Sequence, residues 1–423
     1  MSEKWEKVAL GDVMTLQRGH DLPSHSREHG EIPIVSSSGI TDFHNEAKAN
    51  PPGVVTGRYG TIGEVFYIDQ PYWPLNTALY VKDFKGNNAK FISYVLESLN
   101  LKEMNAAGAV PGINRNHLHK LKLLFPTSRT IQDRIVALVS SYEDLIENNL
   151  KRIKLLEEMA LITYEEWFVR MKFPGHEIAA FDEKTGLPEG WSTRNLGHYI
   201  EHEIGGGWGE EEASKEFSET AYVIRGTDFN GLSTGNRQNV PLRWHKKSNL
   251  ASRKLASGDI IFEVSGGSQN EGVAKTVLMT EELLSLFDED VMCASFCKLA
   301  RPKSTKVGHY LFYFLRFLRK IKASEVFEIR SASNIVNYNW TAFLKFQEVN
   351  FPSNSLLDDF YVISENSTKQ ISVLAKQINL LKEARDILLP RLMTGMIDIE
   401  QVELPEAMLK RLEEQEDKMA TAV

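Results

Sequence analysis

The chain repeats its own opening. The stretch EKWEKVALGD at residues 3–12 and the stretch EGWSTRNLGH at residues 189–198 share a Trp-x4-Leu-Gly pattern, with an acidic residue two positions before each tryptophan. A match of this size is too small to carry a reaction, so it indicates architecture: one folding unit begins twice in the same chain. The paired residues are Trp5 with Trp191, Leu10 with Leu196 and Gly11 with Gly197.

The succession of predicted elements repeats as well. Residues 1–128 contain short β-branched and aromatic runs broken by Gly, Pro and Asn, which are typical of strands and turns, and then a helical stretch, KFISYVLESL. Residues 181–354 show the same order and reach the helical stretch GHYLFYFLRFL. We therefore predict an α/β (α+β) chain with two tandem copies of one domain. Each copy closes with an Asn-x-Asn pair and a Phe-Pro step: Asn114, Asn116, Phe125 and Pro126, then Asn337, Asn339, Phe351 and Pro352.

A different pattern follows each Phe-Pro step. In residues 129–180 and 355–400 apolar side chains recur at steps of three, four or seven, and helix breakers are nearly absent before Pro390. This spacing predicts one long amphipathic helix in each segment. A helix packed only on its own domain would show the same seam, but two matched helices after two matched domains favour a coiled-coil pair.

The direction of the two helices follows from their connections. The first helix leaves domain 1 and ends at domain 2, and the second starts where domain 2 ends, so we expect an antiparallel pair with pseudo-two-fold symmetry. Residues 401–423 are predicted to form an acidic C-terminal tail. The residues expected at the partner-helix interface are Ile146, Ile153, Leu156, Ile371, Ile378 and Leu381.

Composition sets the class of protein. With 42% hydrophobic and 25% charged residues we expect folded domains, and no segment is apolar and long enough to suggest a membrane span. The formal net charge is −8, and much of the acidic excess lies in residues 353–423, so a local basic face on the domains is still possible. Cys293 and Cys297 cannot form a disulfide framework, and we expect core thiols on one face of a strand in a reducing compartment.

One motif suggests a methyltransferase. Asn50, Pro51 and Pro52 resemble the start of the adenine-pocket signature of amino-methyltransferases, but Gly53 stands where an aromatic residue would stack on the base. The chain also lacks a convincing strand and glycine-rich turn for a methyl donor. We interpret the motif as a turn that enters a strand.

Other motifs have equally plain interpretations. Glu46 and Lys48 resemble the end of a nuclease motif, but Asp42 is too close for the usual metal-binding layout, so a solvated loop is favoured. His25 and His29 have no evident third metal ligand nearby. The glycines of GRYGTIGEV lack the Gly-Lys-Ser/Thr of a phosphate loop. We therefore predict no catalytic residue and no metal site in this chain.

Four further stretches resemble a known family. EEWFVRMKFPGHE at 165–177 and ILLPRLMTGMIDI at 387–399 are similar to the segments that end the two conserved helices in specificity subunits of type I restriction-modification systems. LQRGHDLP at 16–23 and IGGGWGEE at 204–211 are similar to the openings of that family's two target recognition domains. The resemblance covers nearly the whole chain, in the order recognition domain, helix, recognition domain, helix.

The resemblance implies a non-catalytic DNA reader. In the family each recognition domain reads one half of a bipartite double-stranded target, and the helices set the spacer and dock two adenine methyltransferase subunits. Those partners hold S-adenosylmethionine, this chain needs no cofactor, and separate motor and endonuclease subunits cleave the DNA. The resemblance also implies a cytoplasmic protein of a bacterium or an archaeon. Two alternatives stay open: a stand-alone DNA methyltransferase or nuclease, and a coiled-coil adaptor that does not bind DNA.

Side-chain chemistry suggests the DNA contacts. Arginine can bind guanine with two hydrogen bonds, asparagine and glutamine can bind adenine, and hydroxyl groups in turns reach phosphates. An ordinary surface or turn role is the alternative at each position. The candidates are Arg18, Ser36, Ser38, Arg58, Tyr59, Arg115 and Asn116 in domain 1, and Arg225, Arg243, Ser265, Gln269, Asn270, Asn337 and Tyr338 in domain 2.

Overall fold

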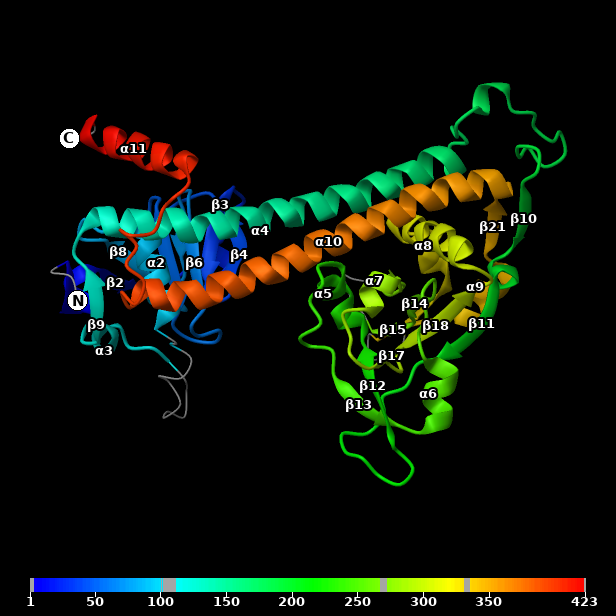
Figure 1. The fold of residues 1–423 in the computed structure, drawn as a ribbon, viewed down its shortest axis with the longest axis horizontal. Helices are drawn as coiled ribbons and strands as arrows, with labels where there is room; N and C mark the ends of the chain where they lie inside the picture. Colours follow the sequence, from blue (N-terminus) through cyan, green and yellow to red (C-terminus); the bar gives the residue numbers. More distant parts are fainter. Residues whose placement is uncertain (1–3, 100, 102–111, 267–271, 331–334, 422–423) are drawn as a thin grey trace. The chain divides into compact units, whose positions relative to one another are not determined.

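The computed structural model describes residues 4–99, 101, 112–266, 272–330 and 335–421 (Figure 1). The chain forms two compact units, the first of residues 1–145 with 381–423 and the second of residues 146–380. Two long helices, α4 (Arg129–Tyr164) and α10 (Asn354–Met393), each contribute to both units. Among the described residues, no helix is both long and apolar enough to cross a membrane.

The first unit contains domain 1, which is built on two small sheets and a ribbon. A four-stranded antiparallel sheet has the order β2-β8-β5-β6, and in a three-stranded sheet β3 lies between antiparallel β4 and parallel β7. The first strand, β1, pairs with the last, β9. The elements are β1 (Trp5–Ala9), α1 (Leu10–Val13), β2 (Thr15–Arg18), β3 (Ile32–Ser36), β4 (Gly39–His44), β5 (Gly53–Gly57), β6 (Val65–Ile68), β7 (Trp73–Pro74), β8 (Ala78–Asp83), α2 (Ala89–Ser98), α3 (Arg115–His119) and β9 (Lys122–Pro126).

Helix α2 joins this domain to the long helices. The Asn88 side chain caps α2 by accepting hydrogen bonds from the amides of Lys90 and Phe91. Its apolar face is fully buried in a core that also contains Ile135 of α4 and Leu392 of α10. In the first unit, domain 1 and the parts of both long helices thus share one hydrophobic core.

The second unit contains domain 2, which repeats this topology. Its four-stranded sheet has the order β11-β18-β14-β16, and β12 lies between antiparallel β13 and parallel β17. The first strand, β10, again pairs with the last, β21. The elements are β10 (Ser192–Asn195), β11 (Ile200–Gly205), β12 (Glu219–Ile224), α5 (Phe229–Ser233), β13 (Leu242–His245), α6 (Lys247–Arg253), β14 (Ile260–Glu263), β15 (Ser265–Gly266), β16 (Thr276–Leu278), α7 (Glu281–Leu284), β17 (Asp290–Cys293), β18 (Cys297–Pro302), α8 (Thr305–Lys320), β19 (Glu328–Arg330), β20 (Val336–Tyr338), α9 (Trp340–Phe346) and β21 (Glu348–Phe351).

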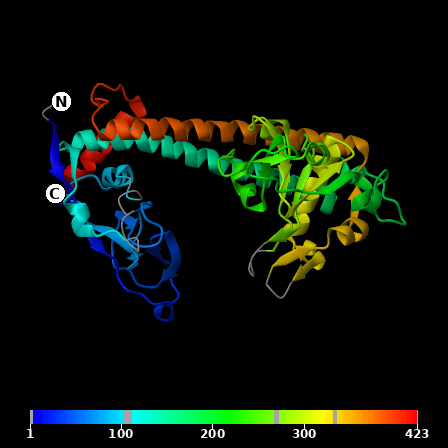
Figure 2. The same ribbon diagram turned by 90° about the horizontal axis from the view of Figure 1, so that it is seen from below.

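The matched strand orders confirm the predicted repeat. Trp5 begins β1 and Trp191 directly precedes β10, and each ring packs against the core of its unit. Gly11 and Gly197 each lie in the short helix that follows that strand. Figure 2 shows the same two folds from below.

The helices of the second unit run antiparallel and side by side (Figures 1 and 2). The side chain of Asn149 donates to Gln377 at 3.2 Å, and the ring of Phe168 packs 5.1 Å from that of Phe360. As α4 proceeds from 149 to 168, its neighbours on α10 therefore proceed from 377 to 360. The antiparallel pairing is confirmed within this unit, whereas the pseudo-two-fold relation between the two halves stays a prediction.

Three details differ from the predictions. Helix α4 ends at Tyr164, and a widened turn, Glu165–Val169, follows it. The predicted tail contains a further helix, α11 (Glu406–Thr421). Cys293 and Cys297 are buried as predicted, but they do not share one strand, because a turn separates the end of β17 from the start of β18.

Candidate nucleic-acid interface

In domain 1 several candidate residues meet at one end of the four-stranded sheet. Strand β2 ends at Arg18, strand β5 ends at Gly57, and β8 begins at Ala78. The register places Arg18 opposite Leu79 and Gly57 opposite Ala78, so all three strands reach the same edge. The sheet therefore presents Arg18 and the loop that follows Gly57 at one place.

Backbone hydrogen bonds fix the loop that leaves β5. The amides of Arg58 and Tyr59 both donate to the carbonyl oxygen of Thr77, at 2.9 and 3.1 Å. The carbonyl oxygen of Arg58 accepts from the amide of Ile113 at 3.0 Å, just before helix α3 begins. Asn114 caps that helix by accepting from the amide of Asn116. These bonds bring Arg115 and Asn116 to the same edge.

The β3–β4 turn lies beside this loop. A Cβ added at Gly57 would stand 3.2 Å from the Cβ of Ser37, and one added at Gly60 would stand 3.4 Å from its hydroxyl oxygen. Ser36 and Ser38 flank Ser37, so they belong to the same edge. The structure thus brings together all seven candidates of domain 1.

The side chains at this edge differ in what they can offer a ligand. The Arg58 guanidinium stacks on the Tyr59 ring at 4.5 Å, and that ring is 39% exposed. Arg115 and Asn116 are exposed. Arg18 forms an exposed ion pair with Asp21 at 3.0 Å. Because an exposed ion pair contributes little stability, an anionic ligand can replace Asp21 as the partner of Arg18.

The two serines of the turn have different roles. The buried Ser36 hydroxyl bonds the Gly39 carbonyl oxygen and accepts from the Ser38 amide. The side chain of Ser38 is exposed. Ser36 therefore maintains the turn, and Ser38 is the hydroxyl that the turn presents.

Domain 2 uses the same backbone bonds at the same place. The amides of Val264 and Ser265 both donate to the carbonyl oxygen of Phe296, at 2.9 and 3.3 Å. The carbonyl oxygen of Val264 accepts from the amide of Tyr338 at 2.8 Å, and Asn339 caps the helix that follows. These residues correspond, in order, to Arg58, Tyr59, Thr77, Ile113 and Asn114. The cap of domain 2 is therefore the second asparagine of its Asn-x-Asn pair, whereas domain 1 uses the first.

Both arginines predicted in domain 2 are held by local partners. Arg225 donates to both carboxylate oxygens of the buried Asp228 at 2.8 and 2.9 Å, and this contact raises the pKa of the arginine. Arg243 stacks on the Trp208 ring at 4.7 Å and pairs with Glu211 at 2.7 Å. Arg225 thus shapes its turn, and Arg243 orients an aromatic ring.

Trp208 is a surface residue that the sequence analysis missed. Its ring is 40% exposed, which is unusual for so large an apolar side chain. The glycines on both sides of it, Gly207 and Gly209, were a usable signal, because they leave the ring uncovered by neighbouring side chains. Held by the largely covered side chain of Arg243, Trp208 offers a flat aromatic surface of the kind on which bases stack.

The remaining candidates of domain 2 have mixed outcomes. The Ser265 hydroxyl donates to the Asn337 side chain at 2.8 Å, which places both at the edge. Gln269 and Asn270 lie outside the described residues. Tyr338 is buried at 7% exposure among the rings of Phe262 and Phe343, so its prediction as a DNA contact is wrong. Because successive side chains of a strand point to opposite faces, β20 exposes Asn337 and buries Tyr338.

A histidine supports the edge of domain 1. The backbone amide of Leu16 donates to Nε2 of His119 at 2.9 Å, which requires that nitrogen to be unprotonated. Burial lowers the pKa of His119, with smaller contributions from Arg115 and Lys85, so the neutral ring is favoured. Within the described ranges, no three His, Cys, Asp or Glu side chains gather as a metal site.

The partner-helix predictions divide by burial. Ile146, Ile153 and Ile378 are buried, at 8%, 4% and 0% exposure. The other three, Leu156, Ile371 and Leu381, are only partly buried. Other apolar residues of the same helices are far more exposed, including Leu155 at 63% and Leu380 at 65%.

Comparisons with known proteins agree with this organisation. The family described as the type I restriction modification DNA specificity domain matches residues 2–158. The chain is 25% identical over 313 residues to the type I restriction enzyme MjaIX specificity subunit of Methanocaldococcus jannaschii, covering 71% of this chain and 66% of that protein. It is 24% identical over 157 residues to the type I restriction enzyme EcoprrI specificity subunit of Escherichia coli, covering 35% of this chain and 39% of that protein.

A solved structure shares the fold. The crystal structure of the type I restriction-modification system S subunit from M. genitalium superposes with a TM-score of 0.53 at 13% sequence identity, over 92% of this chain and 96% of that one. The two curated relatives are matched over about two thirds and about two fifths of their own length. Over residues 2–158 the chain is thus similar to the type I restriction modification DNA specificity domain, and over nearly its whole length it shares the fold of a solved S subunit.

Proposed function

We propose that the chain recognises DNA for a type I restriction-modification complex, and that each domain reads one half of a bipartite target. The observation that carries this proposal is that both domains build the same end of their four-stranded sheet, which we call the reading edge. Both domains hold it with the same backbone bonds but present different side chains there, such as Arg58 and Tyr59 in one and Val264 and Ser265 in the other. A common frame with different side chains suits two readers of two different half-sites.

The two long helices expose apolar residues at matching positions, so each helix can bind one copy of the same partner. Leu155 and Ile162 of α4 are 63% and 54% exposed, and Leu380 and Ile387, at the matching positions of α10, are 65% and 47% exposed. Exposed apolar residues seven apart lie on one helix face and favour association with another helix. In this proposal each helix docks one adenine methyltransferase subunit. S-adenosylmethionine would bind to those partners, motor and endonuclease subunits would join the full complex, and the complex would work in the cytoplasm of a bacterium or an archaeon.

The proposal assigns no catalytic step to this chain. Asn50 to Pro52 precede strand β5 as a turn, as the sequence predicted, and Glu46 forms an ion pair with Lys48 at 2.5 Å on an exposed loop. A stand-alone methyltransferase would require the purified chain to bind S-adenosylmethionine. Calorimetry on the isolated chain tests this alternative, because saturable binding would support it.

A domain exchange tests the two-reader proposal. Residues 1–128 are replaced by the corresponding domain of another specificity subunit, and methylated adenines are mapped in cells that also make the methyltransferase partner. We expect one half of the modified sequence to change and the other half to stay the same. A change in both halves, or in neither, would contradict the assignment of one half-site to each domain. The reciprocal exchange of residues 181–354 should alter only the other half.

A further inference from the structure

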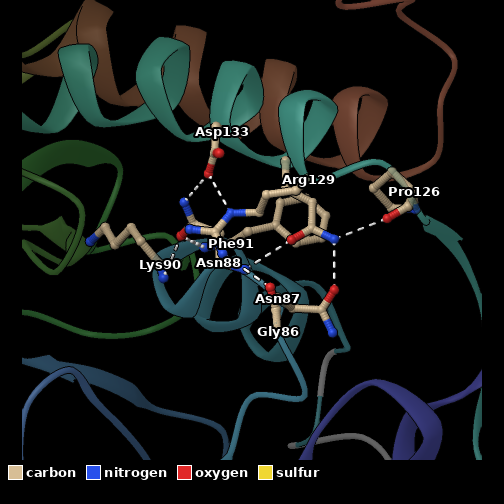
Figure 3. Close-up of polar contacts among 9 residues, drawn as sticks. Gly86, Asn87, Asn88, Lys90, Phe91, Pro126, Arg129 and Asp133 are labelled. Atoms are coloured by element: carbon tan, nitrogen blue, oxygen red, sulfur yellow. Dashed lines mark hydrogen bonds and ion pairs between the residues drawn. The ribbon is translucent and has the colours of Figure 1, made fainter. Parts of the chain in front are cut away.

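Domain 1 is fastened to the first turn of its long helix by a polar network that is centred on a buried side chain (Figure 3). The β8–α2 turn contributes Gly86, Asn87 and Asn88, strand β9 contributes Pro126, and α4 contributes Arg129, Gln132 and Asp133. All of these residues lie in the first unit. We call this network the joint.

Gln132 is at the centre of the joint. It is 1% exposed, and both the nitrogen and the oxygen of its side-chain amide form hydrogen bonds. The amide nitrogen donates to Oδ1 of Asn87 at 2.8 Å and to the carbonyl oxygen of Pro126 at 3.0 Å, and its oxygen accepts from the amide of Asn88 at 2.9 Å. One side chain of α4 thus connects two separate elements of domain 1.

The partners of Gln132 are themselves fixed. Asn87 also donates to the carbonyl oxygen of Val13 in α1, at 2.8 Å. Asn88 donates to Asp133 at 2.5 Å while capping α2, and Arg129 donates to the same carboxylate and to the carbonyl oxygen of Gly86. Hydrogen bonds are directional, so a satisfied buried network holds one orientation where apolar contacts alone would tolerate several.

Domain 2 has no such amide at the matching position. The residue that corresponds to Gln132 is Leu357. The backbone amide of Gln132 donates to the carbonyl oxygen of Ser128, and the backbone amide of Leu357 donates to that of Ser353 at the same place in the other long helix. Leu357 is 5% exposed and belongs to the apolar core of the second unit, with Phe360 and Tyr164. The polar joint is therefore not a requirement of the repeated fold, but a property of domain 1.

We propose that Gln132 is a positioning residue that holds the DNA-reading edge of domain 1 in one orientation on α4, and that it thereby limits the half-site spacing the complex accepts. This inference rests on the proposed function. Gln132 contacts no DNA in this role and acts through Asn87, Asn88 and Pro126. Its loss should relax the preference for one spacer length without altering the bases that either half-site requires.

Three variants separate positioning from stability. Gln132→Leu installs the residue that domain 2 uses and leaves the three polar groups that bond Gln132 without this partner. Gln132→Glu keeps an oxygen that accepts from the amide of Asn88. Its second carboxylate oxygen cannot donate to Oδ1 of Asn87 or to the carbonyl oxygen of Pro126, so these two hydrogen bonds are lost. Ile92→Val is the control, because Ile92 is fully buried in the same core, and the substitution weakens the domain without touching the joint.

The first measurement concerns the free chain. Spin labels at Thr41→Cys and Asp144→Cys report the distance between domain 1 and α4 within the first unit, since both positions are exposed. The native Cys293 and Cys297 are buried and should not take up label. We expect one narrow distance distribution for the parent and for Ile92→Val, and a broader one for both Gln132 variants. Equal widths in all four proteins would overturn the inference.

The second measurement concerns the spacer. Methylated adenines are mapped genome-wide in cells that make each variant with the methyltransferase partner, and modification is compared at spacers one base pair shorter, equal and longer. The loss of two hydrogen bonds in Gln132→Glu, or of three in Gln132→Leu, should raise modification at the wrong spacers, relative to the right one, by about tenfold. An unchanged ratio in both Gln132 variants would overturn the positioning role. If the parent modifies no bipartite site, the proposed function itself fails, which the parent alone reveals.

Discussion

The carbonyl oxygen of Leu75 occupies the place where a side chain at Gly19 would begin, because a Cβ added there would stand 2.1 Å from it. Gly206 meets the carbonyl oxygen of Ala294 in the same way, at 2.2 Å. Both glycines directly follow the first strand of their four-stranded sheet, where the chain reaches the reading edge. Each half therefore requires glycine at this point, for a reason that concerns space rather than backbone angles.

The first prediction tests that requirement. Gly206→Ala should destabilise the second unit by about 1–3 kcal/mol, because backbone atoms cannot rotate away as a side chain could. Gly205→Ala is the matched control, since a Cβ there meets only the flexible end of Lys298 at 3.8 Å. Thermal unfolding by calorimetry measures both. Similar melting temperatures for the two variants would contradict the close approach of Gly206 to the carbonyl oxygen of Ala294.

The second prediction concerns the exposed helix faces. Leu155→Ser should weaken assembly with the methyltransferase partner while leaving the melting temperature of the free chain within about 1 °C, because Leu155 is 63% exposed. Leu380→Ser should do the same at the second position. Analytical ultracentrifugation of the mixed subunits measures assembly.

A buried residue of the same helix serves as the control. Ile153→Ser should lower the melting temperature of the free chain, since Ile153 is 4% exposed and the change leaves a cavity that contains a hydroxyl group. If Leu155→Ser destabilised the free chain as much as Ile153→Ser does, Leu155 would not belong to an open docking face.

The sequence was sufficient for the repeat and the helices, because both depend on order along the chain. Trp5 and Trp191 mark equivalent first strands, and the three-four spacing predicted both long helices. The helical spacing placed Ile153, but not Leu155, at the partner-helix interface, and Ile153 is 4% exposed whereas Leu155 is 63% exposed. The direction of Tyr338 could not be predicted in this way, because it depends on which face of β20 packs against the core.

The third prediction concerns pH. His309 of α8 is buried against α10, with Nδ1 2.6 Å from the hydroxyl oxygen of Ser364. Burial lowers the pKa of His309 to about 4, and the neighbouring charges of Glu365, Glu282 and Lys369 have smaller effects. Since this pKa lies below the ordinary 6.5, the unfolded chain takes up the proton first. The second unit should lose roughly 3 kcal/mol of stability as the pH falls from about 6.5 to about 4.

A substitution isolates the histidine's share of this loss. His309→Gln keeps a polar group that can reach Ser364 but does not titrate. Urea unfolding at several pH values should give a shallower acid loss for this variant than for the parent. Equal slopes would mean that other groups carry the pH dependence.

The fourth prediction concerns the thiols. Burial raises the pKa of Cys293 to about 12, and that of Cys297 is raised for the same reason. Since the thiolate is the reactive form, neither should react with a thiol reagent at pH 8 while the chain is folded. Both should react in denaturant, and a colorimetric thiol assay counts them. Fast reaction of the folded chain would contradict their burial.

The last prediction tests the reading edge itself, in the assembled complex. Arg58 is an exposed guanidinium stacked on Tyr59, so Arg58→Ala should weaken binding to the target duplex by about 1–3 kcal/mol if it contacts a base. If it contacts a phosphate, affinity should fall for all sequences, and the salt dependence of binding should decrease by about one ion. Tyr338→Phe is the control, because the buried hydroxyl has no hydrogen-bond partner among the described residues and its loss should leave both affinity and base preference unchanged. Fluorescence anisotropy over a series of salt concentrations separates these outcomes, and unaltered binding by Arg58→Ala would remove Arg58 from the reading edge.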